Sequence, residues 1–400
     1  MLFLLKTKPN ISFAMETVKT LLETNILPFW LKLRDPAGGF IGRVAADGTP
    51  DPDADRGAIL NARILWTFSA AYRTLRRRSY LVAAAEAKEY FIRHFIDHKY
   101  GGVYWSVDAR GNKKDTKAQL YAQGFAIYAL SEYYAASRDD EAKKAAINTY
   151  RIVETYFADA ANGGYREALS REFKPLEDMR LSEKDENVDK TMNSHLHLLE
   201  GYAALYRIWP DPQLKERTAA LLDLLRTRIF NARTGHLDLY FNADWSVCSR
   251  GISYGHDIET SWLALECAMA LKDFDLVNRI RPMCRALYQG GMEGVQPDGS
   301  LLYEIREDGS LDDSRQWWVE AETVVGNLWA WKYLGVENAA ATAQQALDYI
   351  KTHLVDWDGG EWYWGCDADG RPDLAGDKAG PWKCPYHNAR MCLQILHIFD

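Results

Sequence analysis

Gly101-Gly102-Val103-Tyr104 is one of six places in this sequence where a glycine turn precedes a short aromatic-rich stretch. Successive places are 63, 62, 72, 55 and 69 residues apart, and such a recurring period marks a repeated supersecondary unit. Six units of two helices each, closed into a ring, form an (α/α)6 toroid, so the sequence predicts an all-α barrel. Five of the turns are Gly-Gly and one is Gly-His; they begin at Gly38, Gly101, Gly163, Gly235, Gly290 and Gly359.

The third unit shows the predicted order of elements. Its apolar spacing predicts a helix over residues 145–157, and Gly163-Gly164 ends it because glycine accepts the left-handed backbone that helix ends favour. A polar excursion follows over residues 165–175, and a second helix is predicted over residues 192–207. Other excursions contain a second glycine turn, which favours short β-hairpins on one rim of the toroid. These turns are Ala46-Asp47-Gly48, Ala109-Arg110-Gly111, Pro297-Asp298-Gly299 and Ala368-Asp369-Gly370.

Length and composition predict one large catalytic domain. The 400 residues contain no Pro/Gly/Ser-rich linker, and 47% of them are apolar, which is enough for a large core. We expect a single domain over residues 16–400. Residues 1–15 would be an N-terminal extension that could be disordered, with Met15 as an alternative start. The opening Met1–Leu5 is apolar, but Lys6 interrupts it short of the apolar core of a signal peptide.

Charge and cysteine content narrow the partners and the location. The formal net charge of −8 disfavours nucleic acid and anionic membranes. The six cysteines all lie at or after Cys248 without a C-x-x-C pair, which is typical of free thiols in a reducing compartment. We therefore expect a cytoplasmic protein, a monomer or weak dimer, that acts on a small molecule.

Residues with catalytic chemistry recur near the start of the helix that follows each excursion. If these are the inner helices, their starts converge on one mouth of the ring and build one pocket. The set is Arg63, Tyr121, His195, His197, His256, Trp317, Trp318, Glu320, Glu322 and His387. Asp185, Glu186 and Asp189 precede the third inner helix, as helix-terminal acids or as hydroxyl-binding groups.

Helical spacing sorts the histidines. His195 and His197 cannot both point inward, because residues i and i+2 lie on different faces. His197 shares a face with Asn193 and Glu200, and His256 shares one with Glu259 in the same way. A carboxylate beside an imidazole fixes its tautomer and raises its basicity, which suits a proton-transfer base.

Other roles for these residues stay open at this point. Three histidines also suggest a metal, but the sequence has no His-Glu-x-x-His and no cysteine cluster. Any one histidine or tryptophan could belong to the core. Arg63 could steady an oxyanion or form an ion pair between helices.

Five segments together resemble the N-acylglucosamine 2-epimerase superfamily, and within it the cellobiose 2-epimerases. The resemblance runs from about Glu16 to the C-terminus. The segments begin at Asn61 (Asn-Ala-Arg-Ile-Leu-Trp-Thr-Phe-Ser), Asn193 (Asn-Ser-His-Leu-His-Leu-Leu-Glu), Gly255 (Gly-His-Asp-Ile-Glu), Gln316 (Gln-Trp-Trp-Val-Glu-Ala-Glu) and Gly380 (Gly-Pro-Trp-Lys-Cys-Pro-Tyr-His-Asn). The resemblance implies an (α/α)6 barrel that inverts C2 of the reducing-end sugar of β-1,4-linked disaccharides. It also implies that no cofactor and no metal take part.

The resemblance also implies a role for each matched residue. His256 and His387 would be the acid and base on opposite sides of C2, joined through a cis-enediolate, and Glu259 would orient His256. His197 would assist ring opening, and Arg63 would face O1 and O2 of the intermediate. Substrate-binding roles are implied for Tyr121, Asp185, Asn193, Trp318, Trp382 and Glu322, although either Trp317 or Trp318 could face inward.

Three alternatives remain at the level of sequence. An N-acylglucosamine 2-epimerase or a mannose isomerase of the same superfamily would use the same histidines on a monosaccharide. An inverting glycoside hydrolase also uses α/α toroids, with two carboxyls about 6.5–9.5 Å apart, for which Glu259, Glu320 and Glu322 are available. The last alternative is a sugar- or protein-binding module without catalysis.

Overall fold

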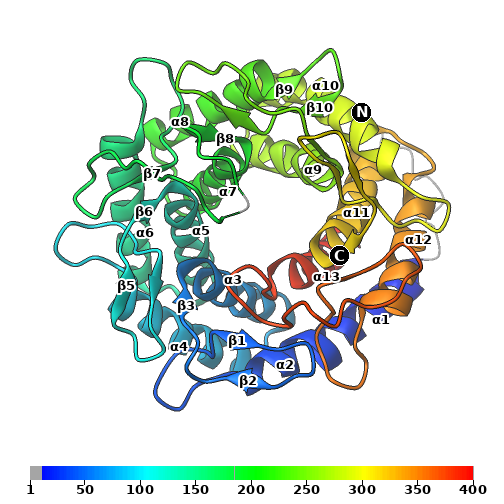
Figure 1. Cartoon of the computed structure of the whole chain (residues 1–400), viewed down its shortest axis with the longest axis horizontal. Coiled ribbons are helices and arrows are strands. Elements are labelled where there is room, and N and C mark those ends of the chain that lie inside the picture. The colour runs from blue at the N-terminus through cyan, green and yellow to red at the C-terminus, as the bar shows by residue number, and fades with distance from the viewer. Residues whose placement is uncertain (1–10, 184, 400) are drawn as a thin grey trace.

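A ring of inner helices, each paired with an outer helix, makes up most of the structure (Figure 1). The structure is a computed structural model that describes residues 11–183 and 185–399. The inner helices are α3 (Ala58–Leu75), α5 (Leu120–Ser137), α7 (Met192–Ile208), α9 (Tyr254–Ala270), α11 (Trp317–Trp329) and α13 (Tyr386–Phe399). The outer helices are α1 (Ile11–Thr20) with α2 (Leu27–Lys32), α4 (Arg78–His94), α6 (Asp140–Ile152), α8 (Pro212–Leu224), α10 (Phe274–Gly291) and α12 (Ala339–Tyr349). Each inner helix packs on the next and α13 contacts α3, which closes the predicted (α/α)6 toroid.

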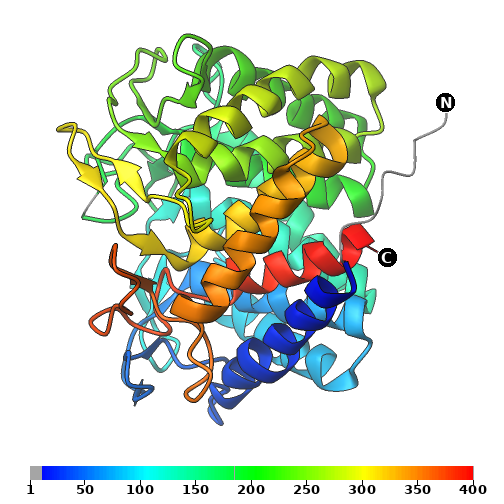
Figure 2. The same ribbon diagram turned by 90° about the vertical axis from the view of Figure 1, so that its right-hand side faces the viewer.

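Short irregular turns continue several helices. One 3-10 turn and five π turns lie in the described ranges: η1 (Leu21–Ile26), η2 (Val153–Phe157), η3 (Leu225–Ile229), η4 (Met292–Gly294), η5 (Ala330–Leu334) and η6 (Ile350–Leu354). η1 joins α1 to α2, and this combined helix packs against α13 (Figure 2). The last inner helix thus packs on the first outer helix, so the ring closes between segments near the two ends of the chain.

The predicted extension over residues 1–15 falls mostly outside the described residues. Its last five residues, 11–15, belong to α1, so the first outer helix begins before the boundary expected at residue 16. No helix within the described ranges has the length and apolar character needed to cross a membrane.

Burial separates the two helix layers as the packing requires. In α5 every residue from Leu120 to Ser131 is buried, as expected for a helix enclosed on all sides. In the outer helix α6 the buried residues are Ala142, Ala146, Thr149 and Tyr150, which form one stripe. The predicted helices of the third unit, 145–157 and 192–207, correspond to α6 with η2 and to α7.

The glycine turns are confirmed in five units and misplaced in the fifth. Gly39, Gly102, Gly164, Gly235 and Gly360 all have positive φ, where a Cβ is strained. The predicted turn at Gly290-Gly291 is wrong, because both residues lie inside α10. A Cβ on Gly291 would come 2.6 Å from Ile258 Cγ1, so close packing explains this pair. The turn of the fifth unit is at Gly299, with φ +88°, where a hairpin turn was predicted instead.

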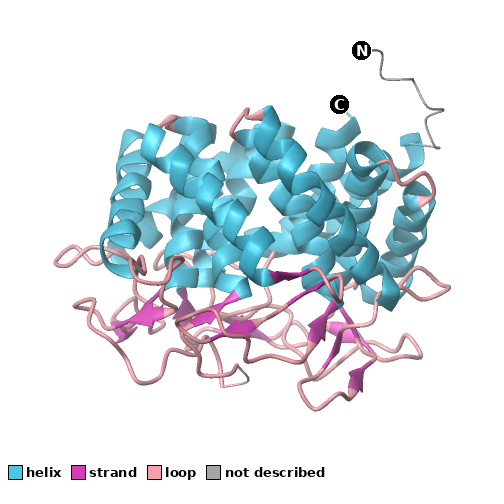
Figure 3. Ribbon diagram, turned by 90° about the horizontal axis from the view of Figure 1, so that it is seen from above, coloured by secondary structure: helices cyan, strands magenta, loops and turns pink. Residues whose placement is uncertain are grey.

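Short strands line one end of the helical ring (Figure 3). They are β1 (Arg43–Val44), β2 (Pro50–Asp51), β3 (Arg56–Gly57), β4 (Ser106–Val107), β5 (Lys113–Asp115), β6 (Ala118–Gln119), β7 (Ala168–Leu169), β8 (Lys190–Thr191), β9 (Phe230–Asn231), β10 (His236–Leu237), β11 (Tyr240–Phe241), β12 (Ile252–Ser253), β13 (Glu304–Ile305), β14 (Leu311–Asp312), β15 (Arg315–Gln316) and β16 (Gly365–Cys366). β3, β6, β8, β12 and β15 each lead directly into an inner helix and pair antiparallel with β4, β7, β11, β13 and β16 of the following unit. These pairs join neighbouring units at the rim where the inner helices begin.

Candidate active site

One position on each inner helix supplies a layer of side chains inside the ring. It is the sixth residue of α3, α5, α7, α9 and α11 and the fifth residue of α13. The ring places these residues side by side, and all of them are at most 3% exposed. The layer consists of Arg63, Phe125, His197, Glu259, Glu322 and Arg390. The sequence-based prediction that distant segments converge on one mouth agrees with this placement.

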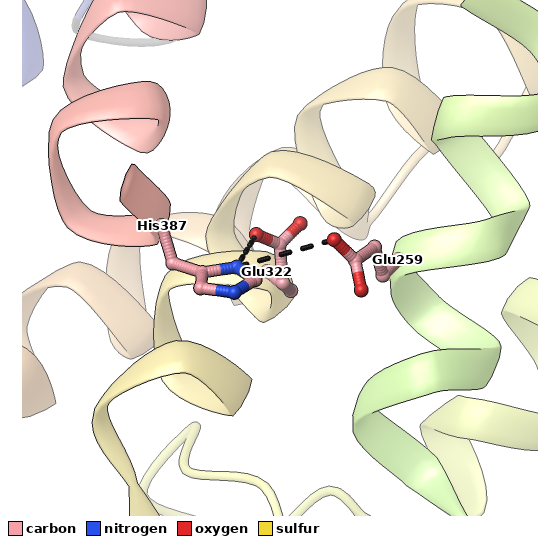
Figure 4. Close-up of side chains that lie close together, drawn as sticks. All are labelled: Glu259, Glu322 and His387. Carbon is pink, nitrogen blue, oxygen red and sulfur yellow. Dashed lines mark hydrogen bonds and ion pairs between the residues drawn. The ribbon is translucent and has the colours of Figure 1, made fainter. Parts of the chain in front are cut away.

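His387 is held from one side by two carboxylates (Figure 4). Its Nδ1 lies 2.7 Å from Glu322 Oε1 and 3.9 Å from Glu259 Oε1. With Nδ1–H donating to Glu322, the neutral ring presents Nε2 as its basic atom. Burial lowers the pKa of His387 well below its ordinary value, against the charge of Glu259 and with a further contribution from Arg63. Burial therefore favours the neutral form of His387.

Arg390 connects the carboxylates beneath the histidines. Its Nη2 lies 2.5 Å from Glu259 Oε1 and 2.7 Å from Glu322 Oε1, and its Nη1 lies 2.7 Å from Glu200 Oε1. Glu259, Glu322 and His387 are the one group in the described residues with ligand atoms close enough to hold a metal ion. The guanidinium of Arg390 already supplies a positive charge to both carboxylates of that group. Glu259, Glu322 and His387 therefore form part of an ion-pair network.

His197 belongs to the same network through Glu200. Nδ1 of His197 lies 3.0 Å from Glu200 Oε2, as the shared helical face predicts. The Tyr386 hydroxyl donates to Glu200 at 2.6 Å and also contacts Arg390. Burial opposes the charged form of Glu200, but Arg390 and the hydrogen bonds from His197 and Tyr386 lower its pKa to about 2.

His256 and His387 both pack against the ring of Trp318. The indole ring of Trp318 is 4.7 Å from the His256 ring and 5.6 Å from the His387 ring. The two imidazoles are therefore close enough for one pyranose and its hydroxyls to bridge. Burial lowers the pKa of His256 to about 4, against the negative charge of Glu259. The tryptophan doublet is resolved as well, because Trp317 packs on Trp364 instead, with ring centroids 4.7 Å apart.

The orientation of His256 differs from the expectation for Glu259. Nδ1 of His256 pairs with Ser253 Oγ at 2.8 Å, whereas Glu259 Oε1 is taken by Arg390. The physical reason is that a full guanidinium charge attracts a buried carboxylate more strongly than a neutral imidazole does. Oε2 of Glu259 is buried without a hydrogen-bond partner among the described residues, so it is available to a ligand hydroxyl.

Arg63 lies in an aromatic cage. Its Nη2 donates to the Tyr121 hydroxyl at 2.9 Å and its Nη1 lies 3.7 Å from Cys384 Sγ. The guanidinium carbon stands 4.3 Å from the Phe125 ring centroid and 4.7 Å from that of Tyr386. Nε has no partner among the described residues. This arginine is not paired with a carboxylate, so it can bind a ligand oxygen.

The remaining predicted residues lie between this layer and the rim. The Tyr121 ring contacts the rings of His197 at 5.2 Å and Trp382 at 6.0 Å, and Trp382 in turn contacts Trp105 at 5.9 Å. Asp185, in the excursion before β8, accepts from Ser182 Oγ at 2.6 Å.

Asn193 and Asp185 differ in how they are held. Oδ1 of Asn193 is buried without a partner among the described residues, which suits a hydroxyl ligand. Burial raises the pKa of Tyr240, and the negative charge of Asp185 raises it further. Burial also raises the pKa of Tyr303, with further contributions from Glu304, Asp312 and Asp185. Asp185 is thus close to these rim tyrosines, and the hydrogen bonds described do not link it to the histidines.

Comparison with known proteins assigns the chain to a family. The family model for N-acylglucosamine 2-epimerase (GlcNAc 2-epimerase) matches residues 39–390. The chain belongs to the N-acylglucosamine 2-epimerase family. Cellobiose 2-epimerases from Bacteroides fragilis and Ruminococcus albus are 47% and 38% identical to it, each over 94% of this chain and 96% of the relative. The solved structure of a cellobiose 2-epimerase from Bacillus thermoamylovorans superposes with a TM-score of 0.92 at 40% identity, covering 96% of this chain and 99% of that one.

For this member of the N-acylglucosamine 2-epimerase family, two groups in the site were missed from sequence. Arg390 and Tyr386 flank His387, but neither was a candidate. The signal for Arg390 was present, since it stands three residues after His387 and shares its helical face. His195 lies outside the site: its Nδ1 lies 2.7 Å from Thr191 O and its Nε2 accepts from Tyr165 N–H at 3.0 Å.

Proposed function

We propose that this protein is a carbohydrate 2-epimerase, an isomerase that inverts C2 of the reducing-end sugar of β-1,4-linked disaccharides. It would convert cellobiose to glucosylmannose and lactose to epilactose. The observation that carries the proposal is that two imidazoles, the buried His387 and the half-buried His256, both pack against the ring of Trp318. Two imidazoles at one sugar ring, one neutral and one protonated, suit removal of a proton from one face of C2 and delivery of a proton to the other. The similarity to cellobiose 2-epimerases supports the disaccharide as substrate.

The first step is opening of the pyranose ring to the aldehyde. His197 is placed for this step, because Glu200 fixes its Nδ1 and the Tyr121 ring lies against it. Its Nε2 can then exchange a proton with a sugar oxygen. The aldehyde makes the C2 proton acidic, since the resulting anion is delocalised onto O1.

The second step moves the C2 proton. One histidine takes this proton and leaves a cis-enediolate, with the negative charge shared between O1 and O2. Arg63 stabilises that charge, because its guanidinium has no carboxylate partner among the described residues and stands in a buried aromatic cage. After rotation of the intermediate, the other histidine, which enters the step as the imidazolium, donates its proton to the opposite face of C2. The first histidine keeps the abstracted proton until it exchanges with solvent. When His387 carries the proton, Glu322 and Glu259 stabilise the imidazolium.

The rim supplies contacts for the rest of the disaccharide. Trp318 and Trp382 offer aromatic faces to the C–H faces of the sugars, and Asn193 and Asp185 offer hydroxyl-binding oxygens. Donation of the proton to C1 instead of C2 would give a ketose, so some aldose–ketose isomerisation is a side reaction of the same geometry. The proposal includes a monomer or weak dimer in the cytoplasm, independent of nucleic acid, in keeping with the free cysteines.

Hydrolysis fits the geometry less well. Glu259 and Glu322 both bind Nη2 of Arg390, at 2.5 and 2.7 Å, so their oxygens lie much closer together than the separation of about 6.5–9.5 Å that inversion needs. Glu320 is occupied by the Leu301 N–H at 2.9 Å. The N-acylglucosamine 2-epimerase and mannose isomerase activities remain the alternatives within the family.

Incubation of cellobiose in heavy water tests the proposal. We expect deuterium at C2 and formation of glucosylmannose, with much slower turnover of mannose and N-acetylglucosamine measured side by side. His256→Asn and His387→Asn should each abolish epimerisation while the protein stays folded. His353→Asn is the matched control, since the hydrogen bond that His353 makes within the described residues is with the Gly370 carbonyl on the rim. Wild-type epimerisation in either active-site variant, or release of glucose from cellobiose, would refute the assignment.

A further inference from the structure

A repeated hydrogen bond fixes the start of four inner helices. The side chain of the fourth residue of the helix accepts the backbone N–H of the residue that follows the glycine turn of the preceding excursion, and this residue lies in an isolated β-bridge or, for Leu237, in β10. The distances are 2.9 Å for Gln123 with Val103, 3.0 Å for His195 with Tyr165, 2.9 Å for Asp257 with Leu237 and 2.9 Å for Glu320 with Leu301. We call this fourth residue the anchor residue. The anchor sets where the first helical turn stands relative to the rim.

The residue that directly precedes the residue donating this N–H differs between units, and each unit is named here by its inner helix. In the α5 and α7 units it is Gly102 and Gly164, and a Cβ there would lie 3.1 Å from Gln123 Oε1 and 2.9 Å from His195 Nε2. In the α9 unit the same position is His236, and in the α13 unit it is Glu361. Both of these side chains are at most 5% exposed.

His236 binds the anchor residue of α9 directly. Its Nδ1 lies 2.7 Å from Asp257 Oδ2, while Asp257 Oδ1 holds the Leu237 N–H. Its Nε2 lies 3.5 Å from Glu293, which is exposed. Asp257 immediately follows His256 in the sequence, so this pair fixes the backbone that carries the histidine.

Glu361 binds the first turn of α13 through its third residue, Asn388. Its Oε1 accepts from Asn388 Nδ2 and, at 2.8 Å, from Lys383 Nζ, and its Oε2 accepts from Trp30 Nε1 at 2.5 Å. Glu361 and Lys383 are fully buried. Asn388 immediately follows His387. The two units that supply the proton-transferring histidines thus both carry an ionisable side chain where the α5 and α7 units have glycine.

We propose that His236 and Glu361 are positioning residues, His236 for His256 and Glu361 for His387. The inference rests on the proposed epimerase function. Each side chain ties down the residue after a histidine, at a helix start that lacks half of its backbone hydrogen bonds. A misplacement of about 1 Å at a reacting group costs roughly a hundredfold in rate, so the anchor is worth most where an imidazole must meet a carbon.

The two positioning residues act on opposite faces of C2, which makes them separable. Exchange of the C2 proton with solvent without inversion needs only the histidine that faces that proton. Cellobiose and glucosylmannose present their C2 protons to different histidines. A defect at His256 should therefore slow exchange into one epimer, and a defect at His387 should slow exchange into the other.

The experiment measures initial rates of deuterium entry at C2 of each epimer in heavy water, separately for cellobiose and glucosylmannose. We expect His236→Ala and Glu361→Ala each to lower epimerisation by about ten- to a hundredfold. The ratio of the two exchange rates should shift in opposite directions in the two variants. This ratio is taken within one preparation, so it does not depend on the fraction of folded protein. His236→Asn and Glu361→Gln, which keep a group at Nδ1 and Oε1 respectively, should restore part of the loss.

Ser300→Ala is the matched control. Ser300 occupies the same position in the α11 unit, and its anchor residue Glu320 follows Val319, which has no catalytic chemistry. The exchange ratio should stay at the wild-type value in this variant. Equal loss of both exchange rates in His236→Ala and Glu361→Ala, or no loss, would overturn the inference. Absence of C2 exchange in the wild type would instead overturn the proposed function.

Discussion

Replacement of Arg390 by methionine should uncouple the charge network under the active site. Arg390→Met keeps most of the apolar stem and removes the one guanidinium that contacts Glu200, Glu259 and Glu322. All four side chains are at most 3% exposed. Three carboxylates would then share a buried site with no cation in contact.

The expected loss of stability follows from burial. Removing one partner of a buried ion pair costs about 3–5 kcal/mol, because the other partner stays desolvated. Unfolding of a 400-residue chain carries an entropy of about 0.8 kcal/mol per degree at about 2 cal/mol/K per residue. The melting temperature should therefore fall by about 4–6 °C. Epimerisation should be lost as well, since His387 loses the fixed orientation of Glu322.

Thermal unfolding at pH 7 and pH 4 measures the loss of stability and its pH dependence. The lowered pKa of Glu200, about 2 against an ordinary 4.5, stabilises the fold above pH 4.5, and that stability is lost as the pH falls toward 2. Because the variant lacks the part of this contribution that Arg390 makes, its deficit should be smaller at pH 4 than at pH 7. Arg73→Met is the control, since the Arg73 side chain is 48% exposed and its pair with Glu132 is weak. A melting temperature for Arg390→Met within a degree of wild type at both pH values would refute the reasoning.

Two further variants test the packing and the buried carboxyls. Gly164→Ala should lower the free energy of unfolding more than Gly163→Ala does, by about 1–3 kcal/mol. Both glycines have positive φ, but only a Cβ at Gly164 would meet Trp245, at 2.4 Å. Equal melting temperatures of the two variants would argue against close packing at Gly164. Burial raises the pKa of Glu320 to about 8, so the native chain holds a proton that the unfolded chain releases near pH 4.5, and stability falls as pH rises between these values. Glu320→Gln keeps an acceptor for the Leu301 N–H and should gain up to about 3 kcal/mol over wild type at pH 7; parallel pH–stability curves from pH 5 to 8 would contradict a buried neutral acid.

The fold could be predicted because the repeat is marked by glycines, which adopt a backbone conformation that other residues rarely adopt. Positive φ at Gly102, Gly164 and Gly360 leaves a visible mark, since few other residues adopt it. The fifth unit misled the prediction, because glycine also serves close packing, as at Gly290 and Gly291 inside α10. Sequence alone cannot separate these two uses.

The site could be predicted in its histidines but not in its charges. His197 and Glu200 are three residues apart, so helical geometry alone pairs them. The partners of Arg390 stand 190, 131 and 68 residues away in the chain. Their meeting depends on how far the ring closes and on which face of α13 turns inward, and no local pattern contains that information.

The ring closes where α13 packs against the first helices of the chain, and this closure, called the seam here, has a consequence for thermal inactivation. α13 carries His387 and Arg390, and it is secured by α3, α11 and the helix formed by α1, η1 and α2. Loosening at this joint alone would withdraw His387, one of the two proposed bases, while the other five helix pairs stay stacked. On heating, turnover should therefore fail at a lower temperature than the bulk helical signal, and loss of catalysis would serve as an early indicator that the seam has opened.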